Sequence, residues 1–195
     1  MCTLAGVGGA TYPPFISLGS HASRINSVAW NPAGTLIASA SNIGVIQLFD
    51  PVTNVCQRVL DGGDSVATIK WSPAGNRLAS TSTNSMHNIK IWDTDTGAYL
   101  RTLPDSSVGV AWSPTGKVLA SASGMQQIFD YVVKLWSPDT GVLLRSLSVH
   151  TDELRSVAWN TARDMLASIS GTTAAEVLGT GSFYEMFKFH PVGRY

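Results

Sequence analysis

The chain has 195 residues, of which 44% are hydrophobic and only 13% are charged. This length fits one domain with a substantial core, and the low charged fraction suggests that some apolar surface is covered by a partner or by a second copy of the same unit. The 13 basic and 13 acidic residues cancel, so no overall field draws the chain toward nucleic acid or an anionic membrane.

Neither a membrane span nor a signal peptide is recognisable in the sequence, and the cysteine usage is typical of an intracellular protein. No run approaches the roughly 18 consecutive apolar residues of a membrane span, and residues 1–10 lack the basic start and apolar stretch of a signal peptide. Cys2 and Cys56 have no metal or redox spacing, which favours two free thiols in a reducing compartment. We therefore expect an intracellular, cytoplasmic protein, with the nucleus left open, and no membrane or nucleic-acid partner.

A repeated pattern divides most of the chain. Residues 1–12 are expected to be a flexible N-terminus, and residues 13–195 divide into four similar segments at about 19–60, 61–103, 104–147 and 148–195. Each segment has a tryptophan that closes a short apolar run, and these tryptophans are spaced by 41, 41 and 47 residues: Trp30, Trp71, Trp112 and Trp159. An Ala-Ser step follows each tryptophan, so the segments are internal repeats.

The residue pattern of each repeat predicts four short strands that follow one another along the chain. The first ends at the tryptophan and an Asn/Ser-Pro-x-Gly turn, the second contains the Ala-Ser step, and the third ends at an aromatic residue. The fourth strands are predicted at 13–18, 55–60, 98–103 and 142–147. Because the first two strands are apolar on both parities, they must be covered on both faces. Four-stranded antiparallel sheets stacked around an axis meet this demand, so we predict an all-β propeller of about four blades.

These residues resemble the WD-repeat family, whose signature combines a Gly-His pair, a Trp-Asp pair and about 40–45 residues per repeat. The resemblance runs from about Phe15 to Gly193 and implies that a His, a strand Ser or Thr, a turn Asp and a Trp form a hydrogen-bonded tetrad in each blade. The matching positions are scattered: His21, Ser39, Ser80, Trp92, Ser121, Asp130, Trp136, His150 and Ser168. Gly62 and Leu103 take the His position in repeats two and three, and only Asp130 matches the turn Asp. No repeat is therefore complete, and we expect blades held mainly by apolar packing.

The fourth repeat departs furthest from the pattern. Thr161 and Arg163 replace the Pro and Gly of its turn, and 184–188 fits a third strand only after a lengthened loop. The rival interpretation is that residues after Ser170 are unrelated sequence. A closed four-bladed ring completed by 13–18 and a partial or half propeller both fit the strand count. The open form would expose an apolar blade face at each end and self-associate.

The resemblance implies that partners bind at the propeller rim, near the starts of the first strands. The polar candidates lie six or four residues before Trp30, Trp71 and Trp159: Arg24, Asn26, Ser65, Glu153 and Arg155. Ordinary solvated loop residues are the alternative interpretation of these positions. Four His and two Cys show no metal-ligand spacing, so neither a metal nor a cofactor is expected.

The expected function is a non-enzymatic scaffold or adaptor that binds proteins or peptides. Two alternatives stay open: a partial product of a longer WD-repeat protein with no independent function, and a propeller-framed hydrolase. A hydrolase needs convergent carboxylates or a nucleophile dyad, and the strand-end positions show neither.

Overall fold

The computed structural model describes residues 21–82, 88–105, 107–123, 131–148, 150, 154–160 and 165–170. These residues contain fourteen β-strands and no helix, so none of them forms a helical membrane span. The strands are β1 (Ile25–Trp30), β2 (Ile37–Ser41), β3 (Val45–Phe49), β4 (Cys56–Asp61), β5 (Val66–Trp71), β6 (Arg77–Ser82), β7 (Ile89–Asp93), β8 (Tyr99–Leu103), β9 (Ser107–Trp112), β10 (Leu119–Ser123), β11 (Val132–Trp136), β12 (Leu143–Leu147), β13 (Leu154–Asn160) and β14 (Met165–Ser170).

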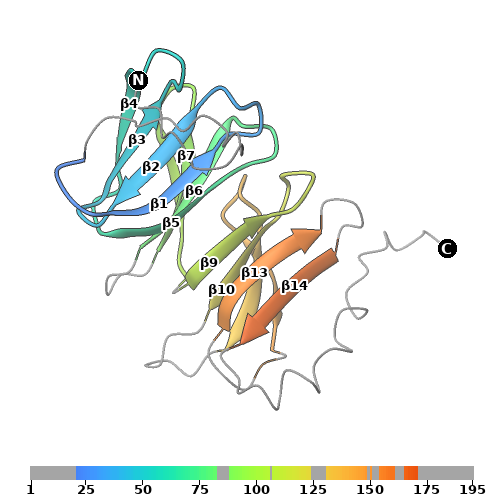
Figure 1. The fold of residues 1–195 in the computed structure, drawn as a ribbon. Helices are drawn as coiled ribbons and strands as arrows, with labels where there is room; N and C mark the ends of the chain where they lie inside the picture. Colours follow the sequence, from blue (N-terminus) through green and yellow to red (C-terminus); the bar gives the residue numbers. More distant parts are fainter. Residues whose placement is uncertain are drawn as a thin grey trace, which may run out of the picture.

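The strands assemble into antiparallel sheets that follow the chain. Strands β1–β4, β5–β8 and β9–β12 form three four-stranded sheets, called blades 1, 2 and 3, and β13 pairs with β14 in blade 4. The first strand of each blade lies against the first strand of the next, from β1 to β5, β9 and β13 (Figure 1). The predicted four-stranded blades are therefore confirmed. The predicted strands at 13–18 and 184–188 lie outside the described residues.

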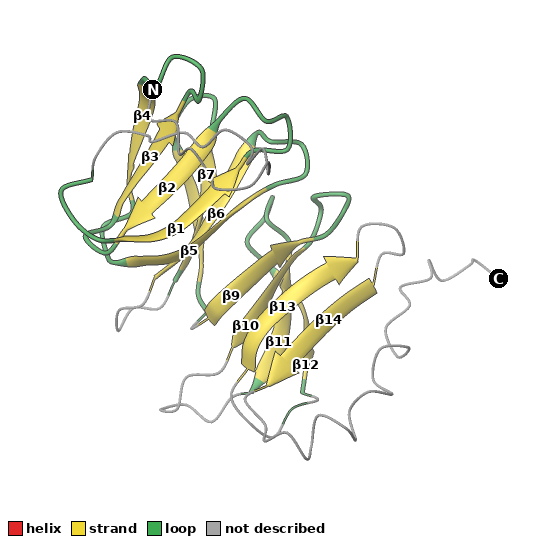
Figure 2. Cartoon of the chain, in the orientation of Figure 1, coloured by secondary structure: helices red, strands yellow, loops and turns green. Residues whose placement is uncertain are grey.

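The described blades form an open row rather than a closed ring. Blades 1 and 2 occupy one end of the molecule, and β13 and β14 stand at the other end beyond β9 (Figures 1 and 2). Of the two arrangements that the sequence allowed, the structure supports a partial propeller.

The second strands are buried because each lies in the middle of its sheet, between two blades. β2 and β10 are buried at every position, and β6 is buried at its four central ones. Their alternating Ala and Ser side chains are small, which leaves room for the larger side chains of the neighbouring strands. Ala38 and Ala40 pack with Ile69 and Trp71 of blade 2 in one cluster, so this core joins two sheets.

A polar residue at or just after the end of the third strand shapes the turn into the fourth strand in blades 1, 2 and 3. The Asp50 carboxylate accepts hydrogen bonds from the backbone N–H groups of Thr53 and Val52, and these bonds lower its pKa. Asp93 accepts from the hydroxyl and N–H of Thr96 at 2.7 Å each, which also lowers its pKa. Ser137, which departs from the family's Trp-Asp pair, accepts the equivalent backbone bond through its hydroxyl. A serine therefore serves the same turn.

One contact joins successive blades and is repeated along the row. The indole N–H of Trp71 donates to the carbonyl oxygen of Ala29 at 3.0 Å, and that of Trp112 donates to Lys70 at 3.0 Å. Trp71 is 8% exposed and Trp112 is 7% exposed. Each of these tryptophans covers the preceding blade and bonds to the backbone residue just before that blade's own tryptophan.

The turns that follow the first strands repeat a second inter-blade contact. A Cβ built on Gly75 would lie 3.5 Å from Cδ of Pro32, and one on Gly116 would lie 3.6 Å from Cδ of Pro73. The proline of the blade 1 turn thus packs against the glycine of the blade 2 turn, and the proline of the blade 2 turn packs against the glycine of the blade 3 turn. Gly34, the equivalent glycine of blade 1, has nothing within 4 Å of that position.

Blade 1 departs from the expectation that the first strands are covered on both faces. Trp30 is 52% exposed and Val28 is 59% exposed, although both occupy positions that are buried in blades 2 and 3. The reason is positional: no described blade precedes β1, so the face that should meet a neighbour is open to solvent.

Replacing equivalent tryptophans with alanine tests this packing. We expect Trp71→Ala and Trp112→Ala each to lower the free energy of unfolding by about 3–5 kcal/mol, because each removes a buried ring from an inter-blade core. Trp30→Ala is the matched control and should cost under about 1 kcal/mol in the monomer, measured by urea denaturation at low protein concentration. Equal losses for all three variants would contradict the assigned burial.

Candidate partner-binding rim

Loops from successive blades gather at one end of the sheets. We call this surface the upper rim and define it by the described residues 21–24, 42–44, 61–65 and 104–105. The backbone N–H of Asn42 donates to the carbonyl of Arg24 at 3.0 Å, and that of Gly62 donates to Gly44 at 2.7 Å. These bonds join the loops before β1 and β5 to the same turn, which lies between β2 and β3.

The predicted rim residues fall into different environments. Arg24 is exposed, and its Nε donates to Oδ1 of Asn26 at 3.2 Å. Asn26 in turn donates to the carbonyl of Val66 at 2.8 Å, so its amide ties blade 1 to blade 2. Ser65 is half-buried in the loop before β5.

Two further predicted rim residues cannot be placed in the same way. Glu153 lies outside the described residues, and Arg155 lies on β13, where only its backbone is described. Among the five candidates, Arg24 is therefore the one described side chain that is exposed.

The structure adds rim residues that the sequence interpretation missed. Ile43 is 51% exposed at the tip of the turn between β2 and β3, and Asp61 is exposed at the end of β4. Asp61 accepts the backbone N–H of Gly63 at 2.9 Å through Oδ1. The sequence did contain a signal for Ile43: it is an apolar residue in a short Asn-Ile-Gly turn, and exposed turns usually have a polar residue at such a position.

The loop at 61–65 is clamped between two blades. Gly44 has a φ of +87°, and a Cβ there would lie 2.9 Å from the backbone of Gly63 and Asp64. Glycine is required because any side chain would collide with backbone atoms. Lys90 of blade 2 donates from Nζ to the carbonyl of Gly62 at 2.5 Å. The upper rim of blades 1 and 2 is therefore a rigid surface.

Below the rim, histidines and tryptophans bond to the strand serines. His21 Nε2 lies 2.6 Å from Ser39 Oγ in blade 1, and His150 Nε2 lies 2.7 Å from Ser168 Oγ in blade 4. Burial lowers the pKa of both histidines because the surrounding protein solvates their charged form poorly.

In blades 2 and 3 the bond comes from the third strand instead. Trp92 donates to Ser80 Oγ at 2.9 Å, and Trp136 donates to Ser121 Oγ at 2.9 Å. Phe49 takes this position in blade 1 and has no N–H to donate. Asp130, the predicted turn member, lies outside the described residues.

The prediction that Leu103 takes the histidine position of blade 3 is wrong. Leu103 is fully buried in the apolar core, and Asp105 approaches the strand serine instead. The hydroxyls of Ser121 and Ser123 both donate to the Asp105 carboxylate. The segment before β9 is shorter than in the other repeats, so counting back from the tryptophan selected the wrong residue.

A lysine completes this cluster around a carboxylate with no solvent access. Lys134 Nζ lies 3.0 Å from Oδ1 of Asp105, and the exposed fractions of the two side chains are 20% and 0%. A buried carboxylate needs donors and a counter-charge to offset lost hydration. Lys134 and the two serines supply them, so blade 3 has an Asp-Ser-Trp arrangement in place of the family's histidine.

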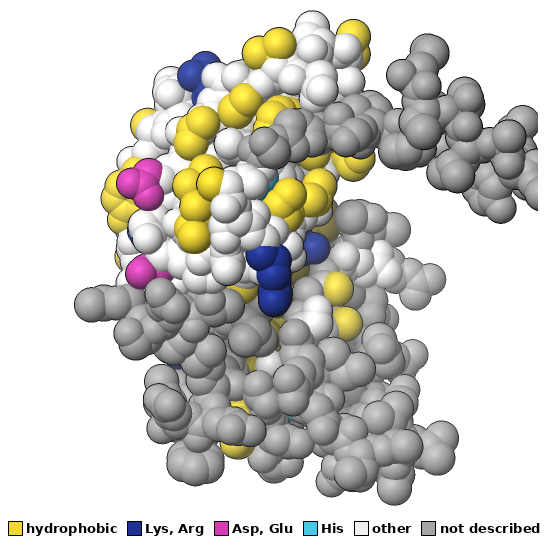
Figure 3. Space-filling model, turned by 60° about the vertical axis from the view of Figure 1, so that its left-hand side comes forward, with side chains coloured by type: hydrophobic (Ala, Val, Ile, Leu, Met, Phe, Trp, Pro, Cys, Tyr) yellow, Lys and Arg dark blue, Asp and Glu magenta, His cyan; other side chains and the backbone are white. Residues whose placement is uncertain are grey.

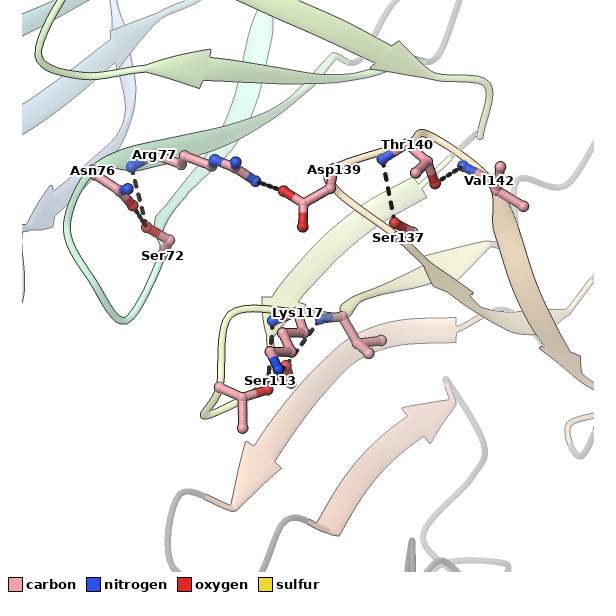
Figure 4. A network of polar contacts seen from close by, with 11 residues as sticks. Ser72, Asn76, Arg77, Ser113, Lys117, Ser137, Asp139, Thr140 and Val142 are labelled. Atoms are coloured by element: carbon pink, nitrogen blue, oxygen red, sulfur yellow. Dashed lines mark hydrogen bonds and ion pairs between the residues drawn. The ribbon is translucent and has the colours of Figure 1, made fainter. Parts of the chain in front are cut away.

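The opposite rim carries a different polar network. There Arg77 of blade 2 forms an ion pair with Asp139 in the third-to-fourth-strand turn of blade 3, and Ser72 bonds to Asn76 beside it (Figure 4). The Arg77 and Asp139 side chains are 30% and 60% exposed. An exposed pair of this kind contributes at most about 1 kcal/mol.

On the described part of the side drawn in Figure 3, hydrophobic side chains are scattered among polar ones, with a few basic and acidic side chains between them. Among the described residues, no three His, Cys, Asp or Glu side chains are grouped so that they could hold a metal ion. Arg24, Ile43 and Asp61 therefore give the upper rim a mixed basic, apolar and acidic character.

Removing the buried carboxylate tests the blade 3 correction. We expect Asp105→Asn to lower the free energy of unfolding by about 3–5 kcal/mol, because it removes the buried carboxylate charge that pairs with Lys134 and accepts two serine hydroxyls. Asp95→Asn, in an exposed turn, is the control and should change stability by less than about 0.5 kcal/mol. Denaturant titration measures both, and a neutral Asp105→Asn would contradict the cluster.

The two half-buried histidines, His21 and His150, predict a dependence of stability on pH. Their pKa is lowered from 6.5 in the folded state, so the unfolded chain binds more protons as the pH falls. Their contribution is fully present above pH 6.5 and is lost as the pH falls through the lowered folded pKa.

The free energy of unfolding should therefore be smaller at pH 5.5 than at pH 7.5, as measured by denaturant titration. The double variant His21→Gln, His150→Gln should show a weaker pH dependence over this interval. An unchanged dependence in the double variant would show that other groups cause it.

Comparisons with known proteins agree with this architecture. The chain is similar to the β-propeller domain of Cps50 (Swd1) from Myceliophteria_thermophila, with a TM-score of 0.64 and 17% identity over 75% of this chain and 50% of that one. It is also similar to a chain of a mitotic checkpoint complex, with a TM-score of 0.66 and 23% identity over 78% of this chain and 48% of that one. The chain thus spans about half the length of both structures.

A search of curated proteins by sequence finds no match. The profile of the family described as "Eukaryotic translation initiation factor eIF2A" matches residues 15–157, which is most of the chain. With its WD-repeat propeller blades, the chain belongs to this eukaryotic translation initiation factor eIF2A family.

Proposed function

We propose that this chain is a non-enzymatic adaptor of translation initiation that binds a partner protein or peptide at its upper rim. The observation that carries the proposal is the clamped loop at 61–65, which joins blades 1 and 2 and leaves Arg24, Ile43 and Asp61 exposed beside it. A rigid surface loses little conformational entropy on binding, and rim loops on a fixed scaffold commonly carry binding residues.

The chemistry of the rim favours a polypeptide partner. Arg24 and Asp61 carry opposite charges and Ile43 is apolar, so a matching surface would present both signs around an apolar residue. A nucleic acid would instead require a basic rim with aromatic side chains. We accordingly propose protein partners and neither nucleic acid nor membrane.

The matched family supports the proposed biological process, and the WD-repeat fold supports the proposed mode of action. The name of the matched family refers to translation initiation, and proteins of similar fold include a member of a multiprotein checkpoint complex. We extend the proposal to a cytoplasmic location, where initiation takes place, and to a role in holding components together rather than in catalysis.

Variants on opposite rims test where the partner binds. The purified chain and the variant Arg24→Glu, Ile43→Asp are used as baits in a translation-competent extract, and captured proteins are quantified by mass spectrometry. We expect a specific subset to fall at least tenfold with the upper-rim variant. The control Asp95→Lys, on the exposed turn at the opposite rim, should retain that subset.

The same experiment also distinguishes binding at the upper rim from binding at the opposite rim, and a protein contact from an RNA-mediated one. Loss of capture by Asp95→Lys alone would contradict the upper-rim assignment. Capture that survives in the upper-rim variant but disappears after ribonuclease treatment would show an RNA-mediated contact and contradict a protein partner.

Density-gradient sedimentation tests the link with initiation. The wild-type chain should cosediment with ribosomal subunits or initiation complexes in the extract, and the upper-rim variant should shift to the top of the gradient. A wild-type chain found only at the top would contradict a role in initiation.

A further inference from the structure

The first face of blade 1, formed by Ile25, Val28 and Trp30 of β1, is an inter-blade surface without a neighbour among the described residues. These side chains are 46%, 59% and 52% exposed. The equivalent residues of β5 are Val66, Ile69 and Trp71, and they are 2%, 1% and 8% exposed because they pack on blade 1. The same sequence positions thus form an interface in one blade and an open apolar surface in the other.

At the other end of the row, the last face of blade 4 has complementary features. We define it by Ser156 and Ala158 of β13, both of which are exposed. Their equivalents in blade 1, Ser27 and Ala29, face blade 2: Ser27 Oγ accepts the N–H of Ile69 at 3.3 Å, and the Ala29 carbonyl accepts the indole N–H of Trp71.

The sequences of the two strands make this equivalence specific. Residues 27–31 and residues 156–160 both read Ser-Val-Ala-Trp-Asn, and both pair in the same register with an Ala-Ser strand. β13 therefore repeats, residue for residue, the part of the β1 strand on which blade 2 packs.

We propose that the first face of blade 1 packs on the last face of blade 4 of a second copy of this chain. Trp30 of one copy would then donate to the carbonyl of Ala158 in the other, as Trp71 donates to Ala29 within the chain. Val28 would lie over Ser156 as Ile69 lies over Ser27. The contact is head-to-tail, because it joins two different surfaces.

Two such contacts close a dimeric ring. Each copy contributes the four first strands β1, β5, β9 and β13, so two copies bring eight blades around one axis, at the upper end of the usual range for propellers. This inference does not depend on the proposed rim partner.

Light scattering coupled to size exclusion tests the stoichiometry with the full chain. We expect twice the 20.7 kDa chain mass at micromolar concentration. Trp30→Arg and Ala158→Arg should each weaken the dimer at least about 30-fold, since each inserts a charged side chain at the centre of the contact. Val59→Arg, at a 61% exposed position on the outer strand β4, is the control and should remain dimeric.

Mixing the two variants tests the head-to-tail arrangement. Trp30→Arg keeps a normal last face and Ala158→Arg keeps a normal first face, so together they form one intact contact. The mixture should therefore contain heterodimer, whereas each variant alone is monomeric. Thermal unfolding of Trp30→Arg as a monomer should be cooperative, because the residue is exposed within its own chain.

Three outcomes would overturn the proposal. A wild-type monomer would show that a second copy does not cover the first face. Open oligomers larger than a dimer would contradict the closed ring. Variants that dissociate but do not associate with each other when mixed would contradict a contact between these two surfaces.

Discussion

The packing of a first-strand tryptophan onto the preceding blade is the interaction on which the rest of this structure depends. In blades 2 and 3 this contact buries the first-strand tryptophan and also satisfies the only polar atom of its side chain, the indole N–H, with a backbone carbonyl. Because the acceptor is backbone, the contact tolerates either Ala29 or Lys70 at the accepting position. The row of blades can therefore be extended by any repeat that supplies the strand and the ring.

This constraint also explains why the polar clusters can vary between blades. Blade 1 has a His-Ser pair, blade 2 a Trp-Ser pair, and blade 3 a buried aspartate with a lysine. Each cluster satisfies the same strand serine with a different donor or acceptor. The apolar contacts between blades are retained while the internal hydrogen bonds differ, so the latter adjust the stability of individual blades rather than specify the fold.

The upper rim and the end faces of the row of blades differ in their chemistry. The upper rim joins polar and charged groups through loops clamped by backbone bonds, which suits recognition of a polypeptide with mixed character. The first face of blade 1 is apolar and shaped by the repeat itself, which suits another blade. The proposed rim partner and the proposed second copy on the end face would therefore not compete for the same residues.

Local periodicity determined much of this protein from sequence alone: the repeats, the strand boundaries within about one residue, and the serine at the centre of each blade all follow from short-range patterns. The tertiary structure decided which of four similar tryptophans is exposed, because burial of a face depends on the presence of a neighbouring blade. It also placed Asp105 rather than Leu103 beside the strand serine. Asn26, a predicted rim residue, instead forms a hydrogen bond from blade 1 to blade 2. These contacts join residues whose separation along the chain varies with loop length, so counting positions could not identify them.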